Sequence, residues 1–257
     1  MLKNRVFVIY LFLLLLLLHW PFSIAVEYNQ CTTSCGEVTN IRHPFRLKSD
    51  PKSCGNPKFE LACINNRTFL DLYPGNYYVR YINYTNYTIR IADVGLQIGN
   101  CSSLPRHSLS CANSSYEWKG YSCWSQPYTC WSQPYENYKL SRTVAIVDST
   151  KAIDSALYVN ASPCFSNFSS MRRRVYAMVD ANVSSVETTC TIKLMAMIPW
   201  WVNCSDLRSY AQIHEQMSYG FELSWLDKAC KTQCKVGYTC AMNATNQIYC
   251  SASGKYL

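Results

Sequence analysis

The sequence predicts a mostly β, disulfide-rich protein, with two small cysteine-stapled β modules in tandem and little helix. Three observations predict this class. Apolar residues alternate with polar ones in several short stretches, fifteen cysteines are spread along the chain, and one stretch alone has helical spacing. Alternation with period two is typical of strands that bury one face. Small modules with thin cores use disulfides to hold such strands together.

The clearest expected strands are short runs in which aromatic, β-branched or other apolar residues fill every second position. Residues of these types fit a pleated, half-buried surface. We expect strands over residues 59–63 (FELAC), 175–179 (VYAMV), 190–198 (CTIKLMAMI) and 221–225 (FELSW).

A β-hairpin is expected over residues 77–93 (YYVRYINYTNYTIRIAD), because two strand-like runs flank a polar centre. In the simplest register Val79 faces Ile91 and Tyr81 faces Ile89, and these pairs supply the inner side of the hairpin.

The same register places Arg80 directly opposite Arg90 on the outer side of the hairpin. Like charges in this position destabilise an antiparallel pair. Two interpretations stay open: an anion sits between the two arginines, or both side chains are splayed into solvent.

The one helical stretch covers residues 206–217 (DLRSYAQIHEQM), with Asp206 as its expected cap. The residues that share one helical face there are Leu207, Tyr210, Ala211 and Ile213.

Residues 113–140 are expected to form a connector between the two modules. They show little alternation and contain the sequence WSQPY twice, at 124–128 and 131–135. A duplication is tolerated best in an exposed loop, where added length costs little closure entropy.

The chain begins with a basic start, a long apolar run and small residues at Ser23 and Ala25. This order is typical of a secretory signal peptide over residues 1–25. A membrane anchor is the alternative, but the run is short for a span of about 20 residues and Pro21 interrupts it.

The cysteines are expected to form structural disulfides, because secreted chains meet oxidising conditions. No Cys-x-x-Cys pair occurs, and the four histidines are scattered, so no metal site is expected. An odd count leaves one thiol over, and the duplicated loop explains it if Cys123 and Cys130 compete for one partner. The expected bridging cysteines are Cys31, Cys35, Cys54, Cys63, Cys101, Cys111, Cys164, Cys190, Cys204, Cys230, Cys234, Cys240, Cys250 and one of Cys123 or Cys130.

Asn-x-Ser/Thr sequons are dense along the chain, which behind a signal peptide predicts a glycosylated exterior. The expected sites are Asn66, Asn83, Asn86, Asn100, Asn113, Asn167, Asn182, Asn203 and Asn243.

The formal net charge is +8, and removal of Lys3 and Arg5 with the signal peptide leaves +6. Outside the cell, a basic surface favours acidic partners such as uronic-acid polysaccharides. No nucleic-acid-binding motif accompanies the charge. The sequence also lacks the hydrolase, metalloprotease, phosphate-loop and kinase signatures, so no enzyme activity and no cofactor are expected.

The first module carries a recognisable set of motifs: C-x3-CG at residues 31–36, IRHPF at 41–45 and CGNPKFELAC at 54–63. The hairpin ending in Asp93 and then Cys101 continue the set. This combination resembles the galacturonan-binding module of plant wall-associated receptor kinases.

Farther on, YGFELSW at 219–225 is similar to the C-terminal wall-associated module, and the cysteines up to Cys250 extend that likeness. The combination resembles the ectodomain of the leaf-rust resistance class of receptor-like kinases. The resemblance implies a galacturonan-binding module at 26–112, the connector at 113–140 and a C-terminal wall-associated module at 141–257.

The resemblance implies a secreted extracellular domain that binds pectic galacturonan in the plant cell wall. Arginine and lysine would pair with the carboxylates, and aromatic rings would lie on the sugar faces. The candidate binding residues are Arg42, Arg46, Lys48, Lys52, Lys58, Arg80 and Arg90.

Other interpretations remain open. The chain could bind a peptide or a co-receptor and no sugar, or be a purely structural wall glycoprotein. Full-length relatives carry a transmembrane helix and a Ser/Thr kinase domain that this sequence lacks, so the chain is expected to be either a secreted receptor-like protein or part of a receptor kinase. In the second case its place is the plasma membrane, with a membrane receptor as a further partner.

Overall fold

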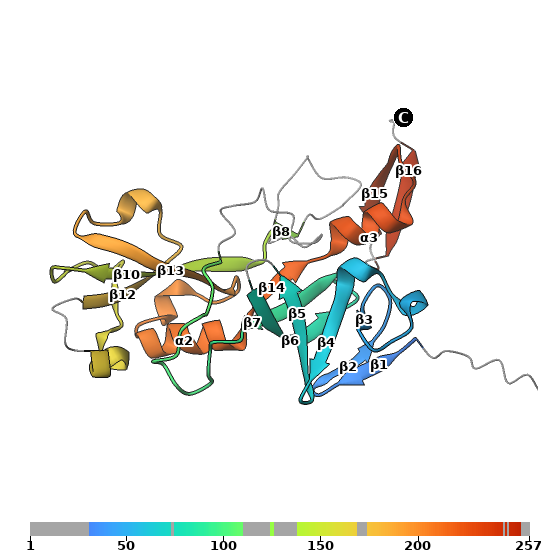
Figure 1. The fold of residues 1–257 in the computed structure, drawn as a ribbon. Coiled ribbons are helices and arrows are strands. Elements are labelled where there is room, and N and C mark those ends of the chain that lie inside the picture. The colour runs from blue at the N-terminus through green and yellow to red at the C-terminus, as the bar shows by residue number, and fades with distance from the viewer. Residues whose placement is uncertain are drawn as a thin grey trace, which may run out of the picture. The chain divides into compact units, whose positions relative to one another are not determined.

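The computed structural model describes residues 31–72, 75–109, 124–125, 138–168, 174–243, 245 and 247–252. The expected signal peptide and most of the connector lie outside these residues. The described residues form a mostly β, disulfide-rich structure whose strands belong to separate sheets, as the sequence predicts (Figure 1).

The larger sheet has six strands in the order β14-β7-β6-β5-β4-β3. The neighbours β3 and β4 run parallel, and every other neighbouring pair is antiparallel. Its strands are β3 (Arg46–Leu47), β4 (Glu60–Ile64), β5 (Arg67–Leu72), β6 (Gly75–Asn83), β7 (Thr88–Asp93) and β14 (Phe221–Ser224).

The β6–β7 hairpin forms as expected, but its register differs from the predicted one. Val79 pairs with Ile91, and then a bulge at Arg80 shifts the pairing by one residue. Tyr81 therefore lies opposite Arg90, and the predicted pairing of Tyr81 with Ile89 is wrong. A bulge places two residues of one strand against one of the other, which period-two alternation does not reveal.

The inner face of this sheet is a hydrophobic core that includes residues from far along the chain. Trp225, directly after β14, is 3% exposed. Its indole ring makes edge-on contacts with the rings of Phe45, Phe59, Tyr84 and Tyr87. The C-terminal half therefore supplies both an edge strand and a central core residue to the N-terminal sheet.

The second large sheet has four antiparallel strands in the order β11-β12-β10-β13. Residues 144–147 of β10 are all buried, because side chains pack on both faces of that strand. The strands are β10 (Ser141–Ser149), β11 (Val159–Asn160), β12 (Arg174–Val179) and β13 (Cys190–Pro199).

Helix α2 (Tyr210–Tyr219) packs against β13 and β7, so it contacts both large sheets. The sequence predicts this helix but misplaces its start. Ser209, not Asp206, is the N-cap: its hydroxyl accepts from the Gln212 backbone N–H, and the Gln212 side chain accepts from the Ser209 backbone N–H. This reciprocal pair is a capping box.

A second helix, α3 (Leu226–Gln233), contradicts the expectation of a single helical stretch. Its buried residues Leu226, Ala229 and Cys230 lie at helical spacing, and Lys231 pairs with Asp227 one turn earlier. The helix is short, and its apolar face is partly formed by a cysteine, so its period is hard to see in the sequence.

Three two-stranded sheets complete the described strands. The pairs are β1 (Thr33–Cys35) with β2 (Val38–Ile41), β8 (Trp124–Ser125) with β9 (Tyr138–Lys139), and β15 (Tyr238–Met242) with β16 (Ile248–Ala252). No described helix is long and apolar enough to cross a membrane.

Among the described residues, five disulfides join ten of the expected cysteines. The bridges are Cys31–Cys54, Cys35–Cys63, Cys101–Cys164, Cys230–Cys240 and Cys234–Cys250.

Cys190 and Cys204 are free thiols, so the expectation that they form bridges is wrong. Cys190 begins β13 and Cys204 follows the end of that strand. A strand rises about 3.3 Å per residue, so β13 holds the two apart by far more than the roughly 7 Å Cα separation that a disulfide allows. Cys111, Cys123 and Cys130 lie outside the described residues.

Candidate functional site

The outer face of β5 and β6 carries a cluster of two arginines and two aromatic rings. Thr68 and Leu70 on β5 point into the core, so Arg67 and Phe69 point outward. Phe69 pairs across the strands with Tyr78 on β6, and the two ring centroids are 5.0 Å apart. We call Arg67, Phe69, Tyr78 and Arg80 the Tyr78 face.

Both arginines of this face lie over the same aromatic ring. The guanidinium carbons of Arg67 and Arg80 are 5.4 and 5.6 Å from the centroid of Tyr78. Nη1 of Arg67 also donates a hydrogen bond to Oη of Tyr78 at 3.2 Å. Attraction between the cations and the ring holds two positive charges close together despite their mutual repulsion.

Arg80 reaches this position because it is the bulged residue of β6. Its Nη2 donates to the carbonyl oxygen of Ser218 at 3.5 Å. Ser218 lies in the last turn of α2, where helix carbonyls lack partners within the helix and carry partial negative charge. The bulge, Tyr78 and the end of α2 together fix the position of the Arg80 guanidinium.

The Tyr78 face is suited to bind an acidic sugar. Among the described residues, neither Arg67 nor Arg80 forms an ion pair. Each guanidinium keeps N–H donors for a carboxylate, which it can hold through two parallel hydrogen bonds. The Tyr78 and Phe69 rings supply an apolar surface beside these charges.

Arg90 is not opposite Arg80, so the predicted arginine pair is wrong. The bulge moves Arg90 opposite Tyr81, and Nη2 of Arg90 forms an ion pair with Oε1 of Glu222 at 2.8 Å. Arg90 also donates to Oη of Tyr219, and its guanidinium lies 5.2 Å from the ring centroid of Trp201. Its charge is therefore compensated within the protein.

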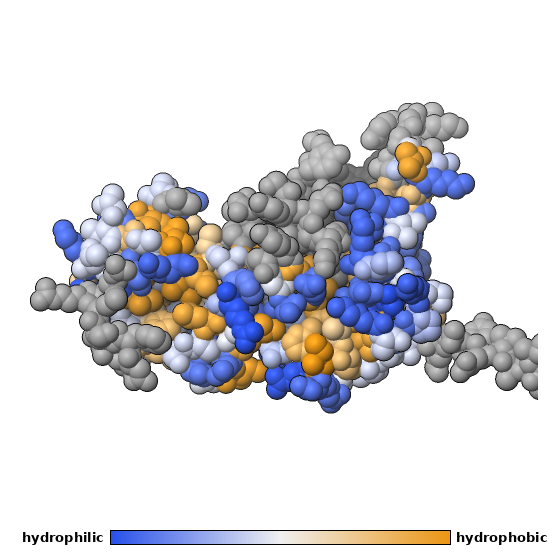
Figure 2. All heavy atoms as spheres, in the orientation of Figure 1, coloured by the Kyte–Doolittle hydropathy of each residue, from blue (hydrophilic) through white to orange (hydrophobic). Residues whose placement is uncertain are grey.

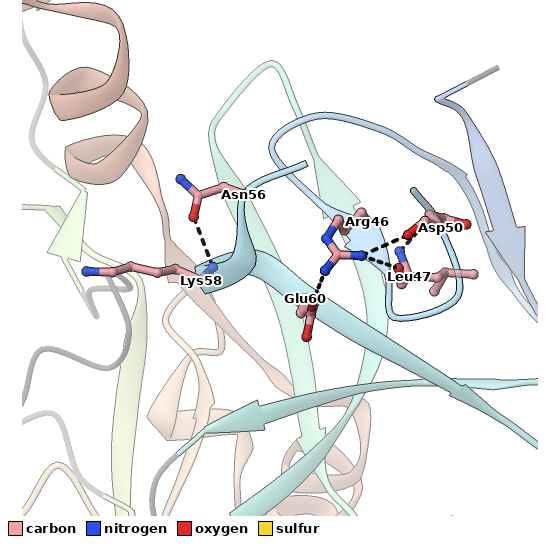
Figure 3. A network of polar contacts seen from close by, with 6 residues as sticks. All are labelled: Arg46, Leu47, Asp50, Asn56, Lys58 and Glu60. Atoms are coloured by element: carbon pink, nitrogen blue, oxygen red, sulfur yellow. Dashed lines mark hydrogen bonds and ion pairs between the residues drawn. The ribbon is translucent and has the colours of Figure 1, made fainter. Parts of the chain in front are cut away.

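Arg46 is buried, which contradicts its expected role at a ligand surface. Its side chain is 5% exposed and forms an ion pair with Glu60. Its Nη1 donates to the backbone carbonyls of Leu47 at 3.3 Å and Asp50 at 2.9 Å (Figure 3). A buried charge needs such partners, so Arg46 stabilises the loop between β3 and β4.

The three candidate lysines lie exposed on the segment that joins β3 to β4. Lys58 extends away from the Arg46 network, and its backbone N–H donates to Oδ1 of Asn56 at 2.9 Å (Figure 3). In the space-filling view, hydrophilic residues surround a smaller apolar area over the region of β3 and β4 (Figure 2). Among the described residues, Lys48, Lys52 and Lys58 form no ion pair.

Arg42 is exposed and contacts the ring of Tyr84. Its guanidinium carbon is 4.6 Å from the ring centroid of Tyr84. Oη of Tyr84 accepts from the Arg42 backbone N–H at 2.8 Å and donates to the Arg42 carbonyl at 3.0 Å. The ring therefore fixes the backbone of Arg42 as well as covering its side chain.

Sequence reasoning named Arg80 but missed Arg67, Phe69 and Tyr78. The alternation in RTFLDL at residues 67–72 was the available signal, because it separates outward Arg67 and Phe69 from inward Thr68 and Leu70. The register that joins Phe69 to Tyr78 depends on the turn between the strands, which alternation alone does not fix.

The Tyr78 face lies in the part of the chain that is similar to a known protein family. Residues 31–93 match a family model described as wall-associated receptor kinase galacturonan-binding. We call residues 31–93 the galacturonan-binding domain, after the family model that they match. The match covers about a quarter of the chain. No curated protein and no solved structure matches the chain.

The galacturonan-binding domain contains β1 to β7 and all four residues of the Tyr78 face. The edge strand of its sheet, however, is β14, and its core includes Trp225. Both lie beyond the matched residues. The family suggests a pectic ligand, and a disulfide-rich domain of this family implies an extracellular location. Among the described residues, no group of His, Cys, Asp and Glu could hold a metal ion.

Proposed function

We propose that the protein is a secreted, glycosylated extracellular domain that binds pectic galacturonan on the Tyr78 face. The observation that carries the proposal is the pair Arg67 and Arg80, which lie at one aromatic ring inside the galacturonan-binding domain. Neither has a carboxylate partner among the described residues. Carboxylates of the polymer pair with the two guanidinium groups, and a sugar ring lies against Tyr78 or Phe69.

The exposed Arg42, Lys48, Lys52 and Lys58 have a different role in this proposal. They raise the local concentration of the polyanion through long-range attraction, which is an effect on association rather than on a fixed geometry. Arg46 and Arg90 take no direct part, because Glu60 and Glu222 already compensate their charges.

The positions of the sequons agree with glycosylation. The described side chains of Asn66, Asn86, Asn100, Asn182, Asn203 and Asn243 are exposed, and Asn83 is half-buried. Asn113 lies outside the described residues, as does the side chain of Asn167.

The sequon at Asn66 directly precedes Arg67 but belongs to the other side of β5. Oδ1 of Asn66 accepts from the Gly36 backbone N–H in the turn between β1 and β2. Inward-pointing Thr68 donates to the carbonyl of Cys35, beside the same turn. A glycan at Asn66 would therefore start beside the turn between β1 and β2 and not on the Tyr78 face.

The resemblance to receptor kinases supports a receptor-like role for this domain, either as a secreted receptor-like protein or as the ectodomain of a kinase at the plasma membrane. In both cases the domain recognises the wall polymer and contributes no catalysis of its own.

The test is binding of an unesterified oligogalacturonide to the glycosylated, disulfide-intact protein by calorimetry. The double variant Arg67→Gln/Arg80→Gln should bind about tenfold or more weakly, as expected if each charge-assisted contact contributes about 1 kcal/mol. Arg208→Gln is the matched control, because Arg208 is an exposed arginine before the start of α2, whereas Arg80 contacts its end.

Salt provides an independent readout. Raising the salt concentration from about 0.1 M to about 1 M shortens the Debye length from about 10 Å to about 3 Å, so binding should weaken strongly. Absence of binding at low salt, or equal binding by the double variant, would reject the proposal and favour a domain that recognises a peptide or co-receptor.

A further inference from the structure

A second aromatic cluster lies beyond the galacturonan-binding domain. Trp201, after β13, is 50% exposed, and Tyr219, the last residue of α2, is 47% exposed. Their ring centroids are 6.3 Å apart, and the Arg90 guanidinium carbon lies 4.4 Å from the Tyr219 centroid and 5.2 Å from that of Trp201. We call Trp201, Tyr219 and Arg90 the Trp201 platform.

The two rings of the platform are in contact with Arg90, and about half of each residue stays exposed to solvent. Arg90 contacts both rings and is itself fixed by Glu222 on β14. Large exposed aromatic side chains that are held in place by other groups are typical of binding sites rather than of neutral surface.

The charge of the platform differs from that of the Tyr78 face. Glu222 compensates Arg90 at 2.8 Å, and beside the platform Asp180 compensates Arg142 at 2.7 Å. Arg142 in turn lies 5.1 Å from the ring centroid of Trp200. An anionic sugar therefore gains little net electrostatic attraction here, and an uncharged sugar does not need that attraction.

We propose that the Trp201 platform binds uncharged pyranose rings of wall polysaccharide, with methyl-esterified galacturonan as the ligand. The apolar C–H face of the sugar packs on the rings of Trp201 and Tyr219, and no carboxylate is required. The assignment of the ligand to pectin rests on the proposed function, whereas the aromatic, charge-compensated chemistry of the platform does not.

The platform adjoins the Tyr78 face through the end of α2. Arg80 donates to the carbonyl of Ser218, and Arg90 donates to the hydroxyl of the next residue, Tyr219. Tyr81, which is 53% exposed, pairs with Arg90 across the strands. One polymer with free acid in one stretch and ester in the next could therefore contact both sites.

A second source of uncharged sugar lies close by in the chain. Asn203, two residues after Trp201, is exposed and begins a sequon. Its Oδ1 accepts from the Ser205 backbone N–H at 3.2 Å. A glycan at Asn203 would thus start next to the platform, and the experiment must separate it from the wall polymer.

The experiment measures binding of a methyl-esterified oligogalacturonide by calorimetry at low and high salt. We expect binding that changes less than about twofold between the two salt conditions, since no ion pair forms. Trp201→Ala and Tyr219→Ala should each weaken binding about tenfold. Tyr238→Ala is the matched control, because Tyr238 is 48% exposed but lies on β15.

Ser205→Ala removes the sequon at Asn203 while keeping the Asn203 side chain and its backbone hydrogen bond. Binding of the esterified oligomer by Ser205→Ala supports the proposal, whether or not the protein glycosylated at Asn203 also binds it. If only Ser205→Ala binds the oligomer, the glycan and the oligomer use the same platform. The proposal is overturned if neither the glycosylated protein nor Ser205→Ala binds the esterified oligomer. It is also overturned if Trp201→Ala binds as tightly as the wild type and has the same melting temperature.

The unesterified oligomer, measured in parallel with Arg67→Gln/Arg80→Gln, reports on the Tyr78 face. The two sites can therefore fail independently: loss of the salt-dependent ligand rejects the proposed function, and loss of the salt-independent ligand rejects this inference.

Discussion

Five arginines near the N-terminal sheet illustrate how burial decides the role of a side chain. Arg46 is surrounded by Glu60 and two backbone carbonyls, and Arg90 is paired with Glu222. Arg67 and Arg80 instead share the ring of Tyr78, and Arg42 lies over Tyr84. In the sequence all five are cations within one basic region, and only the folded chain separates structural from exposed charges.

Replacing Arg46 should cost stability rather than direct ligand contacts. Arg46→Met leaves Glu60 and two carbonyls without their donor, and because Glu60 is 31% exposed the loss should be about 2 kcal/mol. Chemical denaturation measures it. Lys48→Met removes the same charge from an exposed neighbour and should change stability by less than about 0.5 kcal/mol. Equal effects of the two substitutions would contradict the assignment.

His214 should make stability depend on pH. It is 2% exposed on α2, and its Nε2 lies 2.8 Å from Oγ of Ser103. Burial lowers the pKa of His214 below its usual value. The unfolded chain therefore binds the proton more readily than the folded chain. The free energy of unfolding keeps its full value above about pH 6.5, the usual histidine pKa. It falls as the pH drops below that value and through the lowered pKa of the folded state.

Melting curves of the wild type and His214→Gln between about pH 8 and pH 5 check this, since the range spans the usual histidine pKa. The wild type should lose melting temperature toward acid more steeply than the variant. Parallel curves for the two proteins would show that other groups cause the pH dependence.

At the scale of elements, strand β14 and the residue after it complete a sheet that begins far earlier in the chain. Phe221 pairs with Ile91, and Trp225 donates its backbone N–H to the carbonyl of Tyr87 at 2.8 Å. The side chain of Trp225 then fills the core between the aromatic rings of the galacturonan-binding domain.

Trp225→Ala should destabilise the protein by about 3–5 kcal/mol through lost burial and a cavity. Trp225→Phe should cost less, because the indole N–H is buried without a hydrogen-bond partner among the described residues. Thermal unfolding followed by circular dichroism compares them. Trp201→Ala is the exposed control, and a loss at Trp201 as large as that at Trp225 would contradict this account of the core.

Prediction from sequence succeeded where the pattern repeats within one element and failed where it depends on a partner. The alternation in CTIKLMAMI predicts β13, and the spacing of Tyr210 and Ile213 predicts α2. The bulge at Arg80 was missed because it is a relation between two strands. For the same reason the sequence identified Arg80 as a candidate but missed Arg67 and Tyr78, which become neighbours only through the pairing of β5 with β6.

At the scale of the whole molecule, the disulfides among the described residues fall into three groups along the chain. Two bridges join the N-terminal segment around β1 to Cys54 and to Cys63 on β4, and one joins Cys101 to Cys164. Two more hold α3 and the residue that follows it to the last hairpin. Density of cysteine predicts such bridges, but the sequence cannot supply their connectivity, and it did not single out Cys190 and Cys204 as the unpaired ones.

Peptide mapping without reduction should recover these five linkages. Cys204 is exposed, so an alkylating reagent should label it in the native protein, whereas half-buried Cys190 should be labelled more slowly. A cross-linked peptide that contains Cys190 or Cys204 would contradict the described connectivity.

The pairing of β7 with β14 has a consequence for how the chain can be divided. β7 ends at Asp93, and its neighbour in the sheet, β14, begins at Phe221. The 127 residues between them therefore form an insertion between two neighbouring strands of one sheet. A fragment that stops where the family match ends would leave β7 as an open edge, and an unpaired edge strand is a template for aggregation. A change of length in the loops of the insertion is tolerable as long as its two ends still meet and α2 still packs against β7.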